Sequence, residues 1–161
     1  MRIALVSSAV ILLAVVAIEA QRGTAVLLVN LPAQARISLS ATSVTFPDAD
    51  PTTTPLVASV PVDITISVRA RVQPNGQVTL TVQSTDDLRS GVTVLPPSLI
   101  TWTVTGSGFA GGILSRSAPQ LVGRWTGSGV RIGTQNYRFE NRWTHPTGIY
   151  SATLVYTLAS P

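Results

Sequence analysis

The stretch from Val62 to Gln83 constrains the fold of this chain more than any other. From Val62 to Val72, apolar side chains occupy every even position and polar or charged side chains every odd one. Successive side chains of a β-strand point to opposite faces, so one face of this segment is apolar and the other is polar. Asn75-Gly76 then supplies a tight-turn signal, and the alternation resumes after it. The pattern predicts an antiparallel hairpin with one face on a core and the other toward solvent.

Further alternating segments predict an all-β protein. A lone hairpin is only marginally stable in water, so it must belong to a larger antiparallel sheet packed on a second layer. No segment after residue 20 has a helical period. About seven to nine strands predict a β-sandwich of immunoglobulin-like architecture. The other expected strands lie within residues 24–30, 37–46, 92–95, 99–105, 121–126, 135–143 and 149–158.

The faces of these strands predict which side chains enter the core. Trp102 alternates with threonines and is expected to be buried. Within 149–158, the residues expected to share a face are Tyr150, Ala152, Leu154, Tyr156 and Leu158. Residues 135–143 are expected to place Tyr137, Phe139 and Trp143 inside and Arg138, Glu140 and Arg142 outside.

The connecting segments follow from proline, glycine and polar clusters. The four prolines between Pro47 and Pro61 predict an extended crossover that is not a strand, because proline lacks the ladder donor. Ser84–Gly91 is expected to be a polar turn, and residues 106–112 a flexible connection. Ile37, Leu39, Val44 and Phe46 are expected to lie in one bent or bulged strand.

The first twenty residues are expected to form a signal peptide. Arg2 precedes an apolar run from Ile3 to Ile18, and the small residue Ala20 is suited to cleavage. A retained membrane anchor is the alternative, although the run is short for a span of about 20 residues. The remaining residues, 21–161, are enough for one domain with its own core.

Composition limits what holds the domain together and what it binds. The chain has no cysteine, so neither a disulfide nor a thiol nucleophile is available. All 11 of its basic residues are arginine, and the net charge of +4 favours anionic partners. Nucleic-acid binding is not predicted, because the aromatic residues fall on the opposite strand face from the arginines.

Few residues are suited to catalysis. His145 is the only histidine and lies beside a turn, so we expect an exposed loop imidazole rather than a catalytic base. Ser107 and Ser128 lie in Gly-Ser-Gly turns without the spacing of a nucleophile elbow. We therefore predict no catalytic site and no cofactor.

Two pairs of carboxylates remain, at Asp48/Asp50 and Asp86/Asp87. The first is expected to form an Asx-type turn in the proline-rich crossover. Asp48 and Asp50 are also candidate ligands of a calcium ion, because hard cations prefer clustered oxygen ligands on loops. A full set of six oxygens is not visible in the sequence.

In the carboxy-terminal residues, Pro146-Thr-Gly148-Ile-Tyr150 leads into an alternating strand that ends at Tyr156-Thr-Leu158 and Pro161. This motif resembles that of the WxL family of bacterial surface domains, and Trp102-Thr-Val104 is similar to the first Trp-x-Leu of that family. Tyr156 replaces the second tryptophan of the family, and Val104 replaces the first leucine. The resemblance implies a secreted β domain that sits non-covalently on the cell wall.

These observations predict a non-catalytic, secreted envelope protein. Arg69, Arg71, Arg138 and Arg142 all lie on the polar side of their strands, and we expect them to form a cationic surface for an anionic envelope polymer or other surface proteins. The membrane is a partner only through the signal peptide. The alternative is a self-assembling fimbria-like or fibre-like subunit, in which residues 24–30 form an edge strand or a donor strand for a neighbour.

Overall fold

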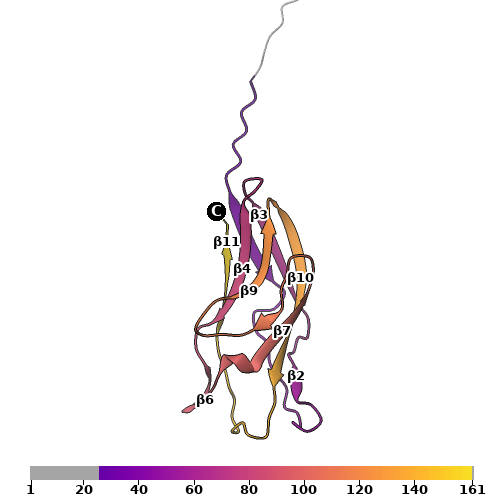
Figure 1. Cartoon of the computed structure of the whole chain (residues 1–161), viewed down its shortest axis with the longest axis vertical. Coiled ribbons are helices and arrows are strands. Elements are labelled where there is room, and N and C mark those ends of the chain that lie inside the picture. The colour runs from indigo at the N-terminus through magenta and orange to yellow at the C-terminus, as the bar shows by residue number, and fades with distance from the viewer. Residues whose placement is uncertain (1–25, 161) are drawn as a thin grey trace, which may run out of the picture. The chain divides into compact units, whose positions relative to one another are not determined.

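The structure, a computed structural model, describes residues 26–160, and these are all-β (Figure 1). The chain divides after Asn30 into a leading segment and a body that begins at Leu31. The body consists of antiparallel sheets, as the predicted β-sandwich requires, and its one helical turn in the described residues is η1 (Pro97–Leu99). The expected signal peptide lies outside the described residues. Within residues 26–160, no helix has the length and apolar character to cross a membrane.

The larger sheet is organised around β10, its longest strand. The strand order is β1-β3-β10-β7-β8, and β2 also pairs with β10. All pairings are antiparallel, with β3 and β2 along one edge of β10 and β7 along the other. The strands are β1 (Gln34–Leu39), β2 (Leu56–Ala58), β3 (Ile64–Arg71), β7 (Ile100–Thr105), β8 (Gly112–Ile113) and β10 (Gly129–Glu140).

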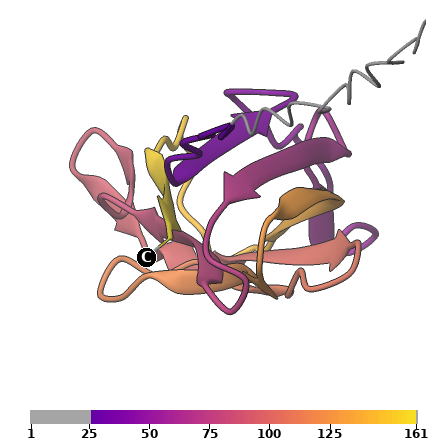
Figure 2. The ribbon, with the colours of Figure 1, turned by 90° about the horizontal axis from the view of Figure 1, so that it is seen from above.

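A second sheet of three strands has the order β11-β4-β9. Its strands are β11 (Leu154–Ala159), β4 (Gln77–Ser84) and β9 (Gln120–Thr126). A separate short hairpin pairs β5 (Leu88–Ser90) with β6 (Thr93–Leu95). Figure 2 shows that β1 of the larger sheet and β11 of the second sheet run beside each other.

The core combines the apolar faces of both sheets. Ile66 and Val68 of β3, and Leu80 and Val82 of β4, are each at most 1% exposed. Every fully buried aliphatic side chain of this kind contributes about 1.5–3 kcal/mol relative to an exposed one. The period-2 pattern therefore predicted the inward faces of these strands correctly, and Trp102 is buried as expected.

The predicted hairpin between Val62 and Gln83 is wrong, because β3 and β4 belong to different sheets. Residues 73–76 form a turn in which the Gly76 amide donates to the Gln73 carbonyl at 2.9 Å. Neither Asn75 nor Gly76 has a positive φ. Pro74 fixes its own φ near −65°, which favours an ordinary turn at 73–76 over the mirror-image turn of a tight hairpin.

A second connection between the sheets lies beside the first. The chain passes from β9 to β10 through residues 127–128, and the Gly127 amide donates to the carbonyl of Gly76 at 2.8 Å. The Ser128 hydroxyl accepts a hydrogen bond from the Val72 amide and donates one to the Val72 carbonyl, both at 3.0 Å. These bonds join the two connections at one end of the sheets.

Three connecting segments differ from expectation. The proline-rich crossover contains β2, because residues 56–60 are free of proline and the first three of them pair with β10. The expected polar turn at 84–91 contains β5, whose Leu88 is buried. The expected single strand at 37–46 is interrupted after Leu39, and Thr45 forms only an isolated bridge to Val60.

The glycine-rich loop at 106–111 is more firmly held than a flexible connection. Trp125 donates its indole N–H to the Ser107 carbonyl at 2.8 Å, and Trp102 donates its own to the Ala110 carbonyl at 3.0 Å. Phe109 packs edge-on against Trp125, with 4.8 Å between ring centroids. The indole rings of Trp102 and Trp125 therefore both hold this loop.

Two other strands are displaced from their predicted limits. β10 ends at Glu140, where the Asn141 amide donates to the Pro55 carbonyl, so Trp143 is 74% exposed instead of buried. β11 begins only at Leu154, although Leu154, Tyr156 and Leu158 do face the core. A strand was also expected at 24–30; residues 26–30 form none, and residues 24 and 25 lie outside the described residues.

Candidate binding surface

The outer face of β3 carries Arg69 and Arg71, as predicted. The β1–β3 register places Arg36 directly opposite Arg69, and Gln34 opposite Arg71. Directly opposed residues share a sheet face, with their Cβ atoms about 4.5–5.5 Å apart. Arg36, Arg69 and Arg71 therefore form one group, which we call the β1/β3 arginine face.

This face has no acidic partner in the described structure. The three ion pairs among residues 26–160 join Arg89 to Asp86, Arg116 to Asp87, and Arg142 to Glu140. Arg71 donates from its Nε to the Pro32 carbonyl at 2.8 Å. A carbonyl oxygen orients a guanidinium without neutralising it, so the β1/β3 arginine face keeps its positive charge.

Neutral residues border the arginine face on the same side of the sheet. Ser38 lies opposite Ser67. In β10, Val130 lies opposite Arg69 and Ile132 opposite Ser67, and these two aliphatic side chains are 56% and 62% exposed. The surface therefore combines unpaired positive charge with hydroxyls and exposed aliphatic groups.

Arg138 and Arg142 do not join this surface. Arg138 lies opposite Thr101 and Ala58, eight residues along β10 from Val130, which corresponds to about 27 Å of extended strand. Arg142 lies beyond the end of β10 and binds the carboxylate of Glu140. Of the four predicted arginines, Arg69 and Arg71 therefore lie together on β3, where Arg36 joins them. Arg138 and Arg142 lie apart from this group.

The carboxylate pairs stabilise loops. The Asp50 carboxylate accepts the Thr52 amide at 2.7 Å, which is the expected Asx-type turn. Within residues 26–160, no group of three His, Asp or Glu side chains is close enough to hold a metal ion, so Asp48 and Asp50 gain no third carboxylate or histidine ligand. Hydrogen bonding from Arg89 lowers the pKa of Asp86, which favours the charged form in this ion pair.

His145 is half-buried and not the exposed imidazole that we expected. Its ring packs against Phe139 with 5.7 Å between centroids, and its Nδ1 is buried without a hydrogen-bond partner. No carboxylate or nucleophile bonds to it in the described structure. The contacts of this histidine are those of a packing residue.

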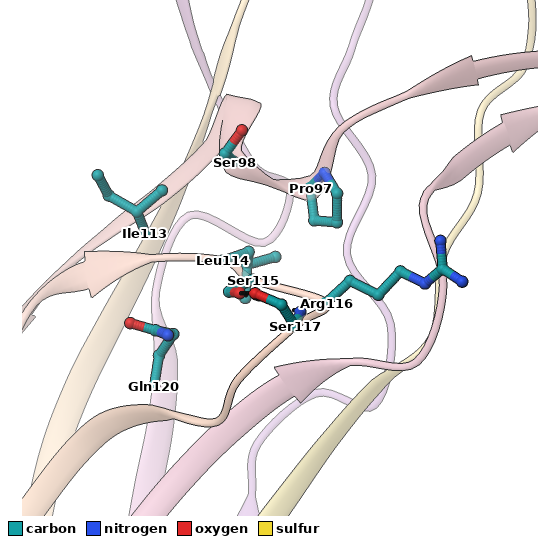
Figure 3. A pocket seen from close by; sticks show the side chains of 8 residues that line it. All are labelled: Pro97, Ser98, Ile113, Leu114, Ser115, Arg116, Ser117 and Gln120. Atoms are coloured by element: carbon teal, nitrogen blue, oxygen red, sulfur yellow. Dashed lines mark hydrogen bonds between the residues drawn. The ribbon is translucent and has the colours of Figure 1, made fainter.

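A shallow pocket lies beside η1 and β8 (Figure 3). Its volume is about 420 Å³, and serine hydroxyls, one amide and one guanidinium supply its polar groups. The guanidinium belongs to Arg116, which binds Asp87, and the figure shows this side chain extending away from the other lining residues. The lining therefore contains serine hydroxyls but no carboxylate or imidazole that could activate them.

Arg36 is the member of the β1/β3 arginine face that was not predicted from the sequence. It lies between the apolar positions Ala35 and Ile37, so its polar orientation on a strand was readable from the sequence. Its position opposite Arg69 depends on the pairing of strands about thirty residues apart, which no local pattern encodes.

Comparison with known proteins identifies no relative. No protein-family model, no curated protein and no solved structure matches this chain.

Proposed function

We propose that this protein is a secreted, non-catalytic β-sandwich of immunoglobulin-like architecture that attaches to an anionic polymer of the bacterial cell envelope. The observation that carries the proposal is the β1/β3 arginine face, where Arg36 and Arg69 lie side by side without an acidic partner. Like charges placed opposite each other destabilise a sheet. Their presence is therefore explained better by an external anion than by a contribution to folding.

The chemistry of this face suits a flexible polyanion. A guanidinium binds carboxylate and phosphate groups through paired hydrogen bonds, and a row of guanidiniums on a sheet follows an extended chain. The resemblance of residues 146–161 to WxL surface domains supports the same location. In this chain the two aromatic positions of that resemblance, Trp102 and Tyr156, face the core.

Binding to wall fragments that carry a phosphate-rich polymer tests the proposal. We expect the variant Arg36→Ser/Arg69→Ser/Arg71→Ser to bind about tenfold more weakly or worse, and we expect the wild-type affinity to fall as salt rises, because both changes reduce attraction to a polyanion. The matched control is Arg124→Ser/Arg138→Ser/Arg142→Ser, which removes the same charge elsewhere. Equal losses of affinity in both variants would show that binding depends on net charge and not on this face, which would contradict the proposal. Binding that is insensitive to salt would also contradict it.

A self-assembling subunit is the second candidate function, and one specific observation favours it. The apolar side chains from Val26 to Leu31 are between 65% and 93% exposed. Such a run of exposed apolar residues is unusual on a soluble monomer and typical of an interaction segment.

A further inference from the structure

The two edge strands β1 and β11 border an incompletely covered part of the core. In β3 and β4, the inward-facing residues Ile66, Val68, Leu80 and Val82 are at most 1% exposed. The residues that pair with them on the edge strands β1 and β11 face the same core but are only partly buried. These partners are Ile37 and Leu39 of β1, and Tyr156 and Leu158 of β11; with Leu154 they define what we call the β1–β11 seam.

The backbone edges along this seam are also unused. β1 pairs only with β3, and β11 pairs only with β4. No backbone hydrogen bond joins residues 34–39 to residues 154–159. Free N–H and C=O groups on an edge strand are a template for another extended chain.

The leading segment has the properties of such a chain. Residues 26–33 contain no turn, bend or strand pairing. In an extended conformation, Leu27, Val29 and Leu31 share one face, which is wholly apolar, whereas Val26, Leu28 and Asn30 share the other. The first face matches the aliphatic and aromatic character of the seam.

Local geometry favours binding to a second molecule over folding back. Pairing of residues 26–31 with β1 of the same chain would need a tight reversal at residues 31–33, where Pro32 provides no amide and no residue has a positive φ. If residues 26–33 continued β1 in a straight line, they would find almost no strand to pair with. Gln34 already pairs with Arg71, close to the end of β3, and the turn at 73–76 follows.

We propose that residues 26–31 of one copy of this protein insert as an edge strand into the β1–β11 seam of a second copy, with Leu27, Val29 and Leu31 facing the core. The contact is heterologous, so its repetition builds a ring or an open chain of subunits. The inference rests on the assembly function, the second candidate above, and is independent of polymer binding.

Two matched double variants test the face that inserts. The variant Leu27→Ser/Val29→Ser removes apolar groups from the face assigned to the seam, and Val26→Ser/Leu28→Ser removes equally apolar groups from the other. Light scattering after size-exclusion chromatography should show oligomers for the wild-type protein and the second variant, and monomers for the first. Equal loss in both variants would indicate unspecific association and would overturn the proposed face.

Disulfide trapping tests where the segment binds. The protein has no cysteine, so Val29→Cys combined with Leu39→Cys or with Leu158→Cys gives an unambiguous cross-link. We expect a ladder of covalent oligomers on non-reducing gels, and no ladder from the control Val29→Cys/Thr126→Cys, in which the second site lies on β9, away from the seam. A cross-linked monomer would place the segment in its own seam and overturn the proposal. Oligomers without a covalent ladder would overturn the proposed binding at the seam but would be consistent with self-assembly. A monomeric wild-type protein would overturn both the seam contact and self-assembly.

Discussion

At the scale of single residues, the packing of Trp125 explains why a glycine is needed at position 123. Trp125 is buried, packs on Phe109 and holds the 106–111 loop through its indole N–H. Gly123 lies beneath this indole, and a Cβ there would overlap the ring. The absence of a side chain at Gly123 therefore makes room for the residue that anchors the loop.

We expect Gly123→Ala to destabilise the protein by about 1–3 kcal/mol, because the overlap must displace either the indole or the strand. Urea unfolding measures the loss, and tryptophan near-ultraviolet circular dichroism should change with it. Gly91→Ala is the control, since Gly91 has a positive φ of 57° but open space around its Cβ position. That control should lose stability through backbone strain without altering the tryptophan signal, and an unchanged signal in Gly123→Ala would contradict the packing argument.

A hydrogen-bonded group of polar residues crosses the core between the sheets. The Tyr156 hydroxyl lies 2.5 Å from that of Tyr137 and donates to the Gln135 Oε1 at 2.6 Å. Gln135 is fully buried, and its Nε2 has no partner. Burial is the main cause that raises the pKa of both phenols above the ordinary value.

These raised pKa values predict a loss of stability in alkali. Above about pH 10 the unfolded chain releases its phenol protons while the folded chain retains them, so unfolding becomes more favourable as the pH rises. Below that pH both states are protonated, and the stabilisation is fully present. For Tyr137, the expected loss is about 1.4 kcal/mol per pH unit. Urea unfolding from pH 8 to 11 measures it, and Tyr137→Phe should reduce the slope to the part that Tyr156 contributes; an equal slope in that variant would disprove the assignment.

At the scale of elements, the sequence predicted strand faces well and strand partners poorly. Period-2 alternation identified the inward residues of β3 and β4, because a buried face must be apolar whichever sheet the strand joins. It could not reveal that these consecutive strands lie in different sheets, since pairing depends on chain segments far apart. The same limit applies to the surface: Arg69 was predicted to be exposed, but its neighbour Arg36 follows only from the register.

The two crossovers between the sheets depend on Ser128. Its hydroxyl makes both of its hydrogen bonds to the backbone of Val72. We expect Ser128→Ala to lower the free energy of unfolding by about 1 kcal/mol, measured by urea titration. Ser107→Ala is the matched control, because Ser107 lies in the other Gly-Ser-Gly sequence and only its carbonyl takes part in a hydrogen bond. Equal effects in the two variants would show that the hydrogen bonds between Ser128 and Val72 do not contribute to the free energy of unfolding.

At the scale of the whole molecule, the proposed binding face is expected to lower the stability of the fold. A chain without cysteine relies on sheet packing, and opposed Arg36 and Arg69 weaken the edge of the larger sheet. Functional surfaces often retain such unfavourable groups, because relieving them removes activity. Stability and polymer binding should therefore respond in opposite directions to the same substitution.

Arg69→Thr separates these two effects. Threonine favours strands and removes the like-charge pair, so we expect a gain of about 0.2–1 kcal/mol in unfolding free energy at low salt. High salt should shrink this gain by screening the wild-type repulsion, while affinity for the anionic wall polymer falls. Arg138→Thr is the control, because its neighbours Thr101 and Ala58 are neutral and no repulsion is relieved. If Arg69→Thr lost stability, or if Arg138→Thr gained as much, the arginine pair would not be the unfavourable element, and the case for an external anion at this face would weaken with it.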